Sequence, residues 1–277
     1  MNEQLKQYFS ADGAYLNIPE NVHLESPIVL HFPTSTAPQH IIMGKNSKAI
    51  FIELEANNAQ TYIYLKDNAC LNYTILQKLP KYLAITIIQD ANSQLDSQIL
   101  GFGGKTNHIS FNASLTGANA NCNVNALEYT KDSETHTLDI QIEHAHPNST
   151  SNTVIRSVLD HNSRCIMNGK ILVTKYSSQV RANLQHKTML LSEYAKIDSK
   201  PQLEIYNDDV VCSHGSSIGT FAADALLYMN SRGISMLEAQ QLLLQSFIAP
   251  IINAIPCASI QQLVQQLLFS EKQLCDF

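Results

Sequence analysis

The chain has 277 residues and a formal net charge of −6, with 44% hydrophobic and 15% charged residues. This balance lacks the clustered Lys and Arg that a phosphate backbone requires, so nucleic acid is excluded as a partner. Charged residues fall below the usual share of about 25%. Asn, Gln, Ser and Thr take their place, which favours strands with neutral polar outer faces over long exposed helices.

The ends and the cysteines of the chain indicate its compartment. Residues 1–10 contain no apolar run of the kind found in a secretory signal, and the longest apolar stretch, 247–258, is interrupted by two prolines and an asparagine. We therefore expect a cytoplasmic protein with no membrane segment. The six cysteines are scattered without a CxxC pair, which predicts reduced and mostly buried thiols.

From about residue 22 to residue 211, apolar and polar residues alternate in short runs. A period of two over many runs predicts strands with one buried face. The clearest runs are AIFIEL (49–54), TYIYL (61–65), LAITII (83–88), TLDIQI (137–142), KILVT (170–174) and QLEIY (202–206).

A polar corner that ends in a small residue recurs between these runs. The steps between the small residues are 22, 24, 27, 43 and 32, with 43 interpreted as two turns. Such spacing is typical of the coils of a β-solenoid, in which corner side chains stack. An antiparallel sandwich remains the alternative from periodicity alone. The small residues are Ser47, Ala69, Ser93, Ala120, Ser163 and Ala195.

After Gly219 the pattern becomes helical. Residues 222–230 predict a helix that ends before Gly233, which can take the left-handed conformation. Ser235 and Glu238 form a capping box that opens a second helix, and residues 260–269 predict a third.

The helices carry strong apolar faces. On the second helix, which is expected to run towards Ala249, the apolar face is predicted from Leu243, Phe247 and Ile251, at steps of four. The three helices either cap the solenoid or dock another subunit, and the sequence leaves both open.

Two motifs carry little chemistry. Residues 101–106 (GFGGKT) resemble the end of a phosphate-binding loop, but its first glycine would fall on Ile99 and no helix pattern follows, so we expect no direct nucleotide binding. His144 and His146 are expected on one strand face, a spacing that a metal could use, yet no third ligand is identified. Hydrogen-bonded histidines are the favoured alternative.

The most unusual stretch is 200–215 (KPQLEIYNDDVVCSHG), which combines three acids, a thiol and an imidazole. In an extended chain Cys212 and His214 share a face, and Gly215 leaves room for a close neighbour. Thiols and imidazoles are ligands for iron and iron–sulfur clusters, so both residues are candidates, with His214 as a candidate metal ligand. A structural role is the alternative.

This stretch also carries a family resemblance. With the segments that follow it, the sequence resembles the SufB/SufD family of iron–sulfur cluster assembly proteins, most closely the SufD branch. The segments are PQLEIYNDDVVCSHG (201–215), SSIG (216–219), DALLY (224–228) and SRGI (231–234), with weaker resemblance at NGKI (168–171) and MLLS (189–192).

The resemblance implies a fold and a domain organisation. The fold is mainly β, with a right-handed parallel β-helix core and a small C-terminal helical domain. A short N-terminal segment (1–20) would precede the core (21–219), and the helical docking domain would follow (220–277).

The resemblance also implies a role as a non-catalytic scaffold. A SufD-like subunit pairs with a SufB-like subunit and docks a SufC-like ATPase, which hydrolyses the ATP. An iron–sulfur cluster would be shared transiently at the interface, near His214 and Cys212. The expected partner-binding residues of the helical domain are Asp224, Tyr228, Arg232 and Gly233.

The sequence departs from the family pattern in three places. The sulfur-receiving cysteine of SufB aligns with Ala195, so we expect the auxiliary partner. Members usually carry an N-terminal helical domain, and only residues 1–20 precede the expected core. Residues 220–223 (TFAA) replace part of an acidic stretch, and only Asp224 is retained. ATPase docking is therefore expected to differ.

Two alternatives remain. One is a homodimeric β-helix binding protein. The other is a β-helix carbohydrate-active enzyme, which the absence of Trp and the 7% aromatic content disfavour.

Overall fold

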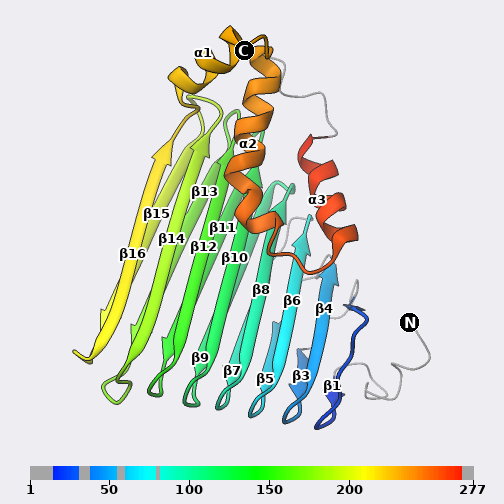
Figure 1. Cartoon of the computed structure of the whole chain (residues 1–277), viewed down its shortest axis with the longest axis vertical. Helices are drawn as coiled ribbons and strands as arrows, with labels where there is room; N and C mark the ends of the chain where they lie inside the picture. Colours follow the sequence, from blue (N-terminus) through cyan, green and yellow to red (C-terminus); the bar gives the residue numbers. More distant parts are fainter. Residues whose placement is uncertain (1–14, 31–37, 55–59, 79–81, 270–277) are drawn as a thin grey trace.

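The computed structural model describes residues 15–30, 38–54, 60–78 and 82–269. Within these ranges sixteen strands precede three helices, and the strands alternate between two eight-stranded sheets (Figure 1). Sheet A contains β1 (Tyr15–Ile18), β3 (Gln39–Met43), β5 (Gln60–Leu65), β7 (Tyr82–Gln89), β9 (Thr106–Leu115), β11 (Thr135–His144), β13 (Arg164–Val173) and β15 (Lys196–Ile205). Sheet B contains β2 (Ile28–Leu30), β4 (Lys48–Leu54), β6 (Cys70–Gln77), β8 (Gln94–Phe102), β10 (Asn121–Thr130), β12 (Thr150–Leu159), β14 (Val180–Leu190) and β16 (Val210–Gly219).

Each coil contributes one strand to each sheet, and every neighbouring pair in both sheets is parallel. The predicted β-solenoid with C-terminal helices is therefore confirmed, and the antiparallel sandwich was wrong. The strands begin at Tyr15 and end at Gly219, so β1 precedes the expected start of the core at residue 21.

The core lies between the two sheets. Along β9 the burial pattern alternates at every position, because successive side chains of a strand point to opposite faces. Large side chains such as Phe51, Tyr73 and Phe111 fill the middle of the solenoid with no exposed surface. The runs predicted from the sequence lie in β4, β5, β7, β11, β13 and β15.

The corners from sheet A to sheet B are built on asparagines. Asn46, Asn68, Asn92 and Asn119 have φ values from 55° to 59°, a conformation that Asn tolerates better than most residues. Their side chains form ladders between coils, with Nδ2 of Asn68 donating to Oδ1 of Asn46 at 2.9 Å and Nδ2 of Asn119 to Oδ1 of Asn92 at 3.0 Å. The predicted stacking of amides at corners is confirmed.

The predicted corner series nevertheless mixed two different corners. Ser163 and Ala195 lie in the turns that return from sheet B to sheet A, after β12 and β14. The corner that follows Ala120 on the original side ends at Ser149, so the step of 43 residues was not two turns. Both turns of a coil place a small residue after a polar one, which explains the error.

Three helices follow the strands: α1 (Ala223–Ser231), α2 (Met236–Ile252) and α3 (Ala258–Phe269). Gly233 ends α1 with a φ of 87°, as predicted. The capping box of α2 is confirmed, since the N–H of Glu238 donates to Oγ of Ser235 and the N–H of Ser235 donates to Oε2 of Glu238. None of the helices in the described part of the chain is long and apolar enough to span a membrane.

Helices α2 and α3 pack on the outer face of sheet B (Figure 1). Leu244, Ile248 and Val264 are buried there against side chains such as Leu100 and Leu127. Of the predicted face, Ile251 is buried, but Leu243 and Phe247 are only half-buried, so the buried face of α2 is centred about one residue later.

Candidate functional site

The solenoid ends in an open coil formed by β15 and β16. Within the described residues, β15 is hydrogen-bonded in its sheet only to β13, and β16 only to β14. In Figure 1, β16 forms the left-hand edge of the front sheet. An edge strand presents a row of N–H and C=O groups that can hydrogen-bond to another strand.

The register places Cys212 and His214 on the inward face of this coil. Cys212 lies opposite Ala182 and His214 opposite Leu184, and both β14 residues face the core. The predicted shared face is confirmed. Burial against the apolar cluster around Leu184 raises the pKa of the Cys212 thiol. His214 faces the same way but is exposed, because no further coil in the described part of the chain covers it.

The other thiols do not add to this site. The prediction of mostly buried thiols holds only for Cys122 and Cys165, whereas Cys70 and Cys257 are half-buried elsewhere and Cys212 is half-buried at the open coil. All five cysteines in the described part of the chain are free, and Cys275 lies outside it.

Hydroxyl groups and apolar side chains complete the inward surface of the open coil. Oγ of Ser199 on β15 lies 2.9 Å from Oγ of Ser216 on β16. Ile205 and Ile218 are 39% and 54% exposed, although their strand partners Val173 and Thr188 are buried. The end of the solenoid is thus an apolar and polar surface that would be core in a continuing coil.

Sequence reasoning missed a buried histidine directly beneath this surface. His186 has no exposed surface, with Nδ1 2.8 Å from Oγ of Ser199 and Nε2 2.9 Å from Oγ of Ser157 and 3.2 Å from Oγ1 of Thr188. Burial, assisted by the charge of Arg156, lowers its pKa to about 4, so the ring is neutral. The available signal was the alternation of His186 with inward-facing apolar residues of β14.

A second buried histidine was also missed. Nδ1 of His136 lies 2.8 Å from Oε2 of Glu128, and Nε2 lies 3.0 Å from the carbonyl oxygen of Gly103. Both partners are acceptors, so both ring nitrogens donate and the ring is charged. Burial alone would lower the pKa of His136, but the hydrogen bond and charge of Glu128 raise it. A Cβ at Gly101 would collide with the Glu128 carboxylate, so glycine makes room for this ion pair.

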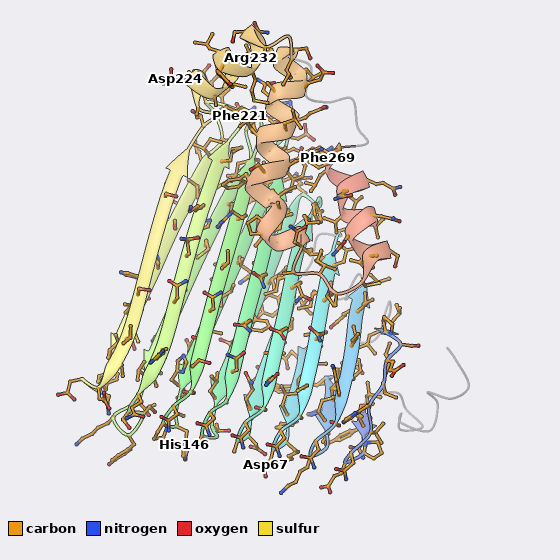
Figure 2. The ribbon with its side chains drawn as sticks, in the orientation of Figure 1. Asp67, His146, Phe221, Asp224, Arg232 and Phe269 are labelled. Carbon is orange, nitrogen blue, oxygen red and sulfur yellow. The ribbon has the colours of Figure 1, made fainter. Side chains whose placement is uncertain are left out.

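The expected shared strand face of His144 and His146 was wrong, whereas the favoured alternative of a hydrogen-bonded histidine holds for His144. His144 faces the core at the end of β11. Its Nδ1 lies 2.8 Å from Oγ of Ser149, and its Nε2 lies 2.8 Å from Oγ of Ser151. The strand ends there, and His146 lies exposed in the following corner (Figure 2). Across the described ranges, no group of three or more His, Cys, Asp and Glu residues could hold a metal ion.

The predicted partner-binding residues form a separate surface on α1. Asp224, Tyr228 and Arg232 are exposed at successive turns, and the Arg232 guanidinium lies 5.3 Å from the centre of the Tyr228 ring. Gly233 follows the helix. Figure 2 shows Asp224 and Arg232 at the opposite end of the molecule from His146. These residues lie on a different element from Cys212 and His214, so the chain offers two surfaces.

A groove of about 550 Å³ separates α2 from α3. Amide side chains such as Gln245, Gln262 and Gln265 line it together with Ile252 and Phe269. Among the described residues that line the groove none is charged, so their hydrogen-bonding capacity comes from amides.

The fold and the site define a parallel β-solenoid protein with an open coil at one end and a C-terminal helical domain. Residues 33–247 match the family described as SUF system FeS cluster assembly, SufBD core domain. The chain belongs to this SufB/SufD family of iron–sulfur cluster assembly proteins.

Curated relatives agree with this assignment. A SufBD family protein of Synechocystis is 27% identical, covering 92% of this chain and 62% of its own length. SufD of Escherichia coli is 29% identical over 65% of this chain and 42% of its own length. SufD of Bacillus subtilis is 26% identical over 90% of this chain and 62% of its own length. The chain thus spans less than two thirds of the length of these relatives.

Proposed function

We propose that the chain is a non-catalytic, SufD-like scaffold subunit that works in the cytoplasm as part of a complex. Its open coil would pair with a SufB-like subunit, and its helical domain would dock a SufC-like ATPase. The observation that carries the proposal is the position of Cys212 and His214, which face inward on a coil that no further described strand covers.

The chemistry of the open coil supports pairing. A partner strand would satisfy the edges of β15 and β16 and would cover Ile205 and Ile218. An imidazole and a thiol at that boundary could contribute to holding a cluster, which is the cargo of the system and is transiently shared. The ligands become fully usable only when the partner supplies the rest of the site, since the described residues form no three-ligand group.

The helical domain supports the second interaction. Leu227 and Tyr228 on α1 are 64% and 61% exposed, and no residue of α1 is buried. Large side chains exposed together on one helix are candidates for an interface. Asp224 and Arg232 flank them with opposite charges. The proposal assigns this face to the ATPase, which would hydrolyse the ATP itself.

Co-expression with the SufB-like and SufC-like proteins of the same organism tests the proposal. We expect a stable complex, in which His214→Ala lowers the rate of cluster assembly while the variant folds and associates normally. His146→Ala is the matched control, because His146 is an exposed histidine away from the open coil. If neither partner associates, the proposal fails. If assembly is unchanged in His214→Ala, His214 has no part in the mechanism.

A homodimer is the second candidate, because the same two strand edges on two copies could pair with each other. Native mass measurement of the chain alone and with its partners separates the two. A dimer that persists in the presence of the SufB-like protein favours the homodimer.

A further inference from the structure

An arginine without an acidic partner lies between sheet B and α2. Arg156 on β12 is only 6% exposed. Its Nε donates to the carbonyl oxygen of Phe247 at 3.3 Å, and its Nη1 donates to the carbonyl oxygen of Ile155 at 3.1 Å. Burial lowers the pKa of Arg156, because the charged form is disfavoured away from water. Arginines this deeply buried are normally paired with an acid.

The guanidinium group of Arg156 keeps hydrogen-bonding capacity that the chain does not use. It has five N–H groups, and only those on Nε and Nη1 donate to an acceptor among the described residues. Nη2 has no such partner, and it does not belong to the fully enclosed atoms that lack one. An acceptor from outside the chain can therefore reach Nη2.

A second cation lies next to Arg156 on the outer face of sheet B. Lys187 on β14 is the strand partner of Arg156 and is exposed. Like charges directly opposite each other on neighbouring strands are destabilising, so this pair lowers the stability of the fold unless an anion compensates it. None of the ion pairs between described residues includes Arg156 or Lys187.

The acidic side chains on the neighbouring elements are distant or already bonded. Among the described strands, Asp96 on β8 is the only acid on the outer face of sheet B, and it lies two strands away from β12. Asp160, just after β12, is 3.4 Å from Nδ1 of His161. Helix α3 has no charged residue, and the only acid of α2 is Glu238, whose carboxylate is bonded to Ser235.

The space beside the two cations is open. In Figure 1 the outer faces of β14 and β16 lie beside α2, and below α1 no helix crosses in front of them. From Ser213 to Gly219 the outer face of β16 carries only serine and glycine. A Cβ added at Gly215 or Gly219 would meet no atom within 4 Å. Another protein can therefore come close to Lys187 and to Nη2 of Arg156.

We propose that Arg156 and Lys187 bind the carboxylate of an acidic side chain on a partner protein. The planar guanidinium matches the two oxygens of a carboxylate, and the ammonium group adds a second positive charge. The carboxylate would accept from Nη2 and compensate both cations. Strand β16 connects the open coil to α1, so a protein on either surface would lie near this site. The partner rests on the proposed function, whereas carboxylate binding does not.

Titration of the isolated 277-residue chain with succinate at constant ionic strength tests the carboxylate site. The chain has four arginines, so NMR with ¹⁵N-labelled arginine can follow each Nε–H group. We expect the Arg156 signal to shift, and the signal of Arg164, which is already paired with Asp198, to stay. Lys187→Gln should weaken binding about threefold or more. Lys48→Gln is the matched control, because Lys48 is an exposed lysine on the same face, on β4.

Two results of the titration overturn the carboxylate site. One is an Arg156 signal that does not shift, or that shifts equally in the parent chain and in Lys187→Gln. The other is tighter binding of inorganic phosphate than of succinate, which would assign the two cations to a phosphate ligand. Arg156 itself is left unchanged in these variants, because it also contacts α2.

Charge reversal tests whether the carboxylate comes from a partner. Lys187→Glu should weaken association with the SufB-like or the SufC-like protein about tenfold or more, and Lys48→Glu should not. If the parent chain and Lys187→Glu associate equally well, the partner carboxylate is overturned and the proposed function stands. If the parent chain associates with neither protein, the proposed function fails together with the partner, and the succinate result still decides the carboxylate site.

Discussion

The buried histidines of this solenoid have charge states that their partners decide. His136 lies between two acceptors and is charged, whereas His144 and His186 lie between hydroxyls and are neutral. Burial lowers the pKa of both neutral rings to about 4, against 6.5 for an exposed histidine. Because the pKa of each neutral ring differs between the folded and the unfolded chain, the stability of the fold depends on pH.

The sign follows from the protons bound in each state. Between pH 6.5 and about pH 4 the unfolded chain protonates both histidines while the folded chain does not, so acid favours unfolding. Between about pH 7.5 and about pH 5 each histidine should cost about 2 kcal/mol of stability. Glu53 acts in the opposite direction, because burial raises its pKa to about 7 despite its hydrogen bond from Tyr73, and ionisation at higher pH disfavours the fold.

His144→Gln tests this account. The variant cannot be protonated, so we expect its loss of stability on acidification to be smaller than that of the parent chain by about 2 kcal/mol. Urea unfolding at the two pH values measures it. His146→Gln, two residues away and exposed, should keep the acid sensitivity of the parent. Equal acid sensitivity in His144→Gln and the parent chain would contradict the assigned charge state.

At the scale of elements, α2 is tied to the solenoid in its second half. Pro250 lies inside the helix and has no N–H, so the carbonyl group of Ser246 lacks its usual helical partner. Close to this point, Nε of Arg156 on β12 donates to the carbonyl oxygen of Phe247 at 3.3 Å, and the guanidinium lies 5.5 Å from the centre of the Phe247 ring. Arg156 thus supports a weakened part of the helix from the face of sheet B.

The cap at the start of α2 provides the prediction at this scale. Ser235→Ala removes the acceptor for the N–H of Glu238, and we expect a loss of about 1 kcal/mol. Thermal unfolding and amide exchange in the first turn of α2 measure it. Ser246→Ala is the control on the same helix, because Ser246 is exposed in the helix interior. Ala has the higher helix propensity there, so this variant should gain about 0.5 kcal/mol of stability. Equal losses in both variants would mean that the cap contributes nothing.

Strands and helix ends could be predicted because their signals are local. The period of two in residues 83–88 and the capping box at Ser235 depend only on neighbours in the chain. The phase of the coils is not local. Ser163 follows a polar residue in the same way as Ser47, but it lies in the opposite turn, and only the pairing of strands separates the two.

The candidate site also combines features that depend on local sequence with features that depend on the stacking of coils. That Cys212 and His214 share a face follows from alternation within β16, so the sequence could predict it. The hydrogen bond between Ser199 and His186 joins residues that are 13 apart in the chain and lie on different sheets. Its formation depends on the stacking of two coils, and alternation within one strand contains no information on which residues of the next coil lie opposite.

For the whole molecule, the surfaces of the solenoid differ in how well they are covered. Helices α2 and α3 cover part of the outer face of sheet B, and the coils cover each other along the axis. The coil of β15 and β16 has inward-facing side chains without a further coil. Its contribution to stability in isolation is therefore small, and its apolar surface gains most from contact with another chain.

A charged residue on this surface should affect partner binding but not the stability of the isolated chain. Ile218 faces inward on β16 and is 54% exposed, so Ile218→Lys should leave the free energy of unfolding of the isolated chain almost unchanged. In the complex a partner would bury the new charge, and we expect affinity to fall roughly a hundredfold or more, because an unpaired buried charge costs about 3 kcal/mol. Val29→Lys is the matched control, since Val29 is 55% exposed on β2 at the other end of sheet B. Sedimentation of the chain with a SufB-like protein, the proposed partner, measures both, and normal association of Ile218→Lys would place the interface elsewhere.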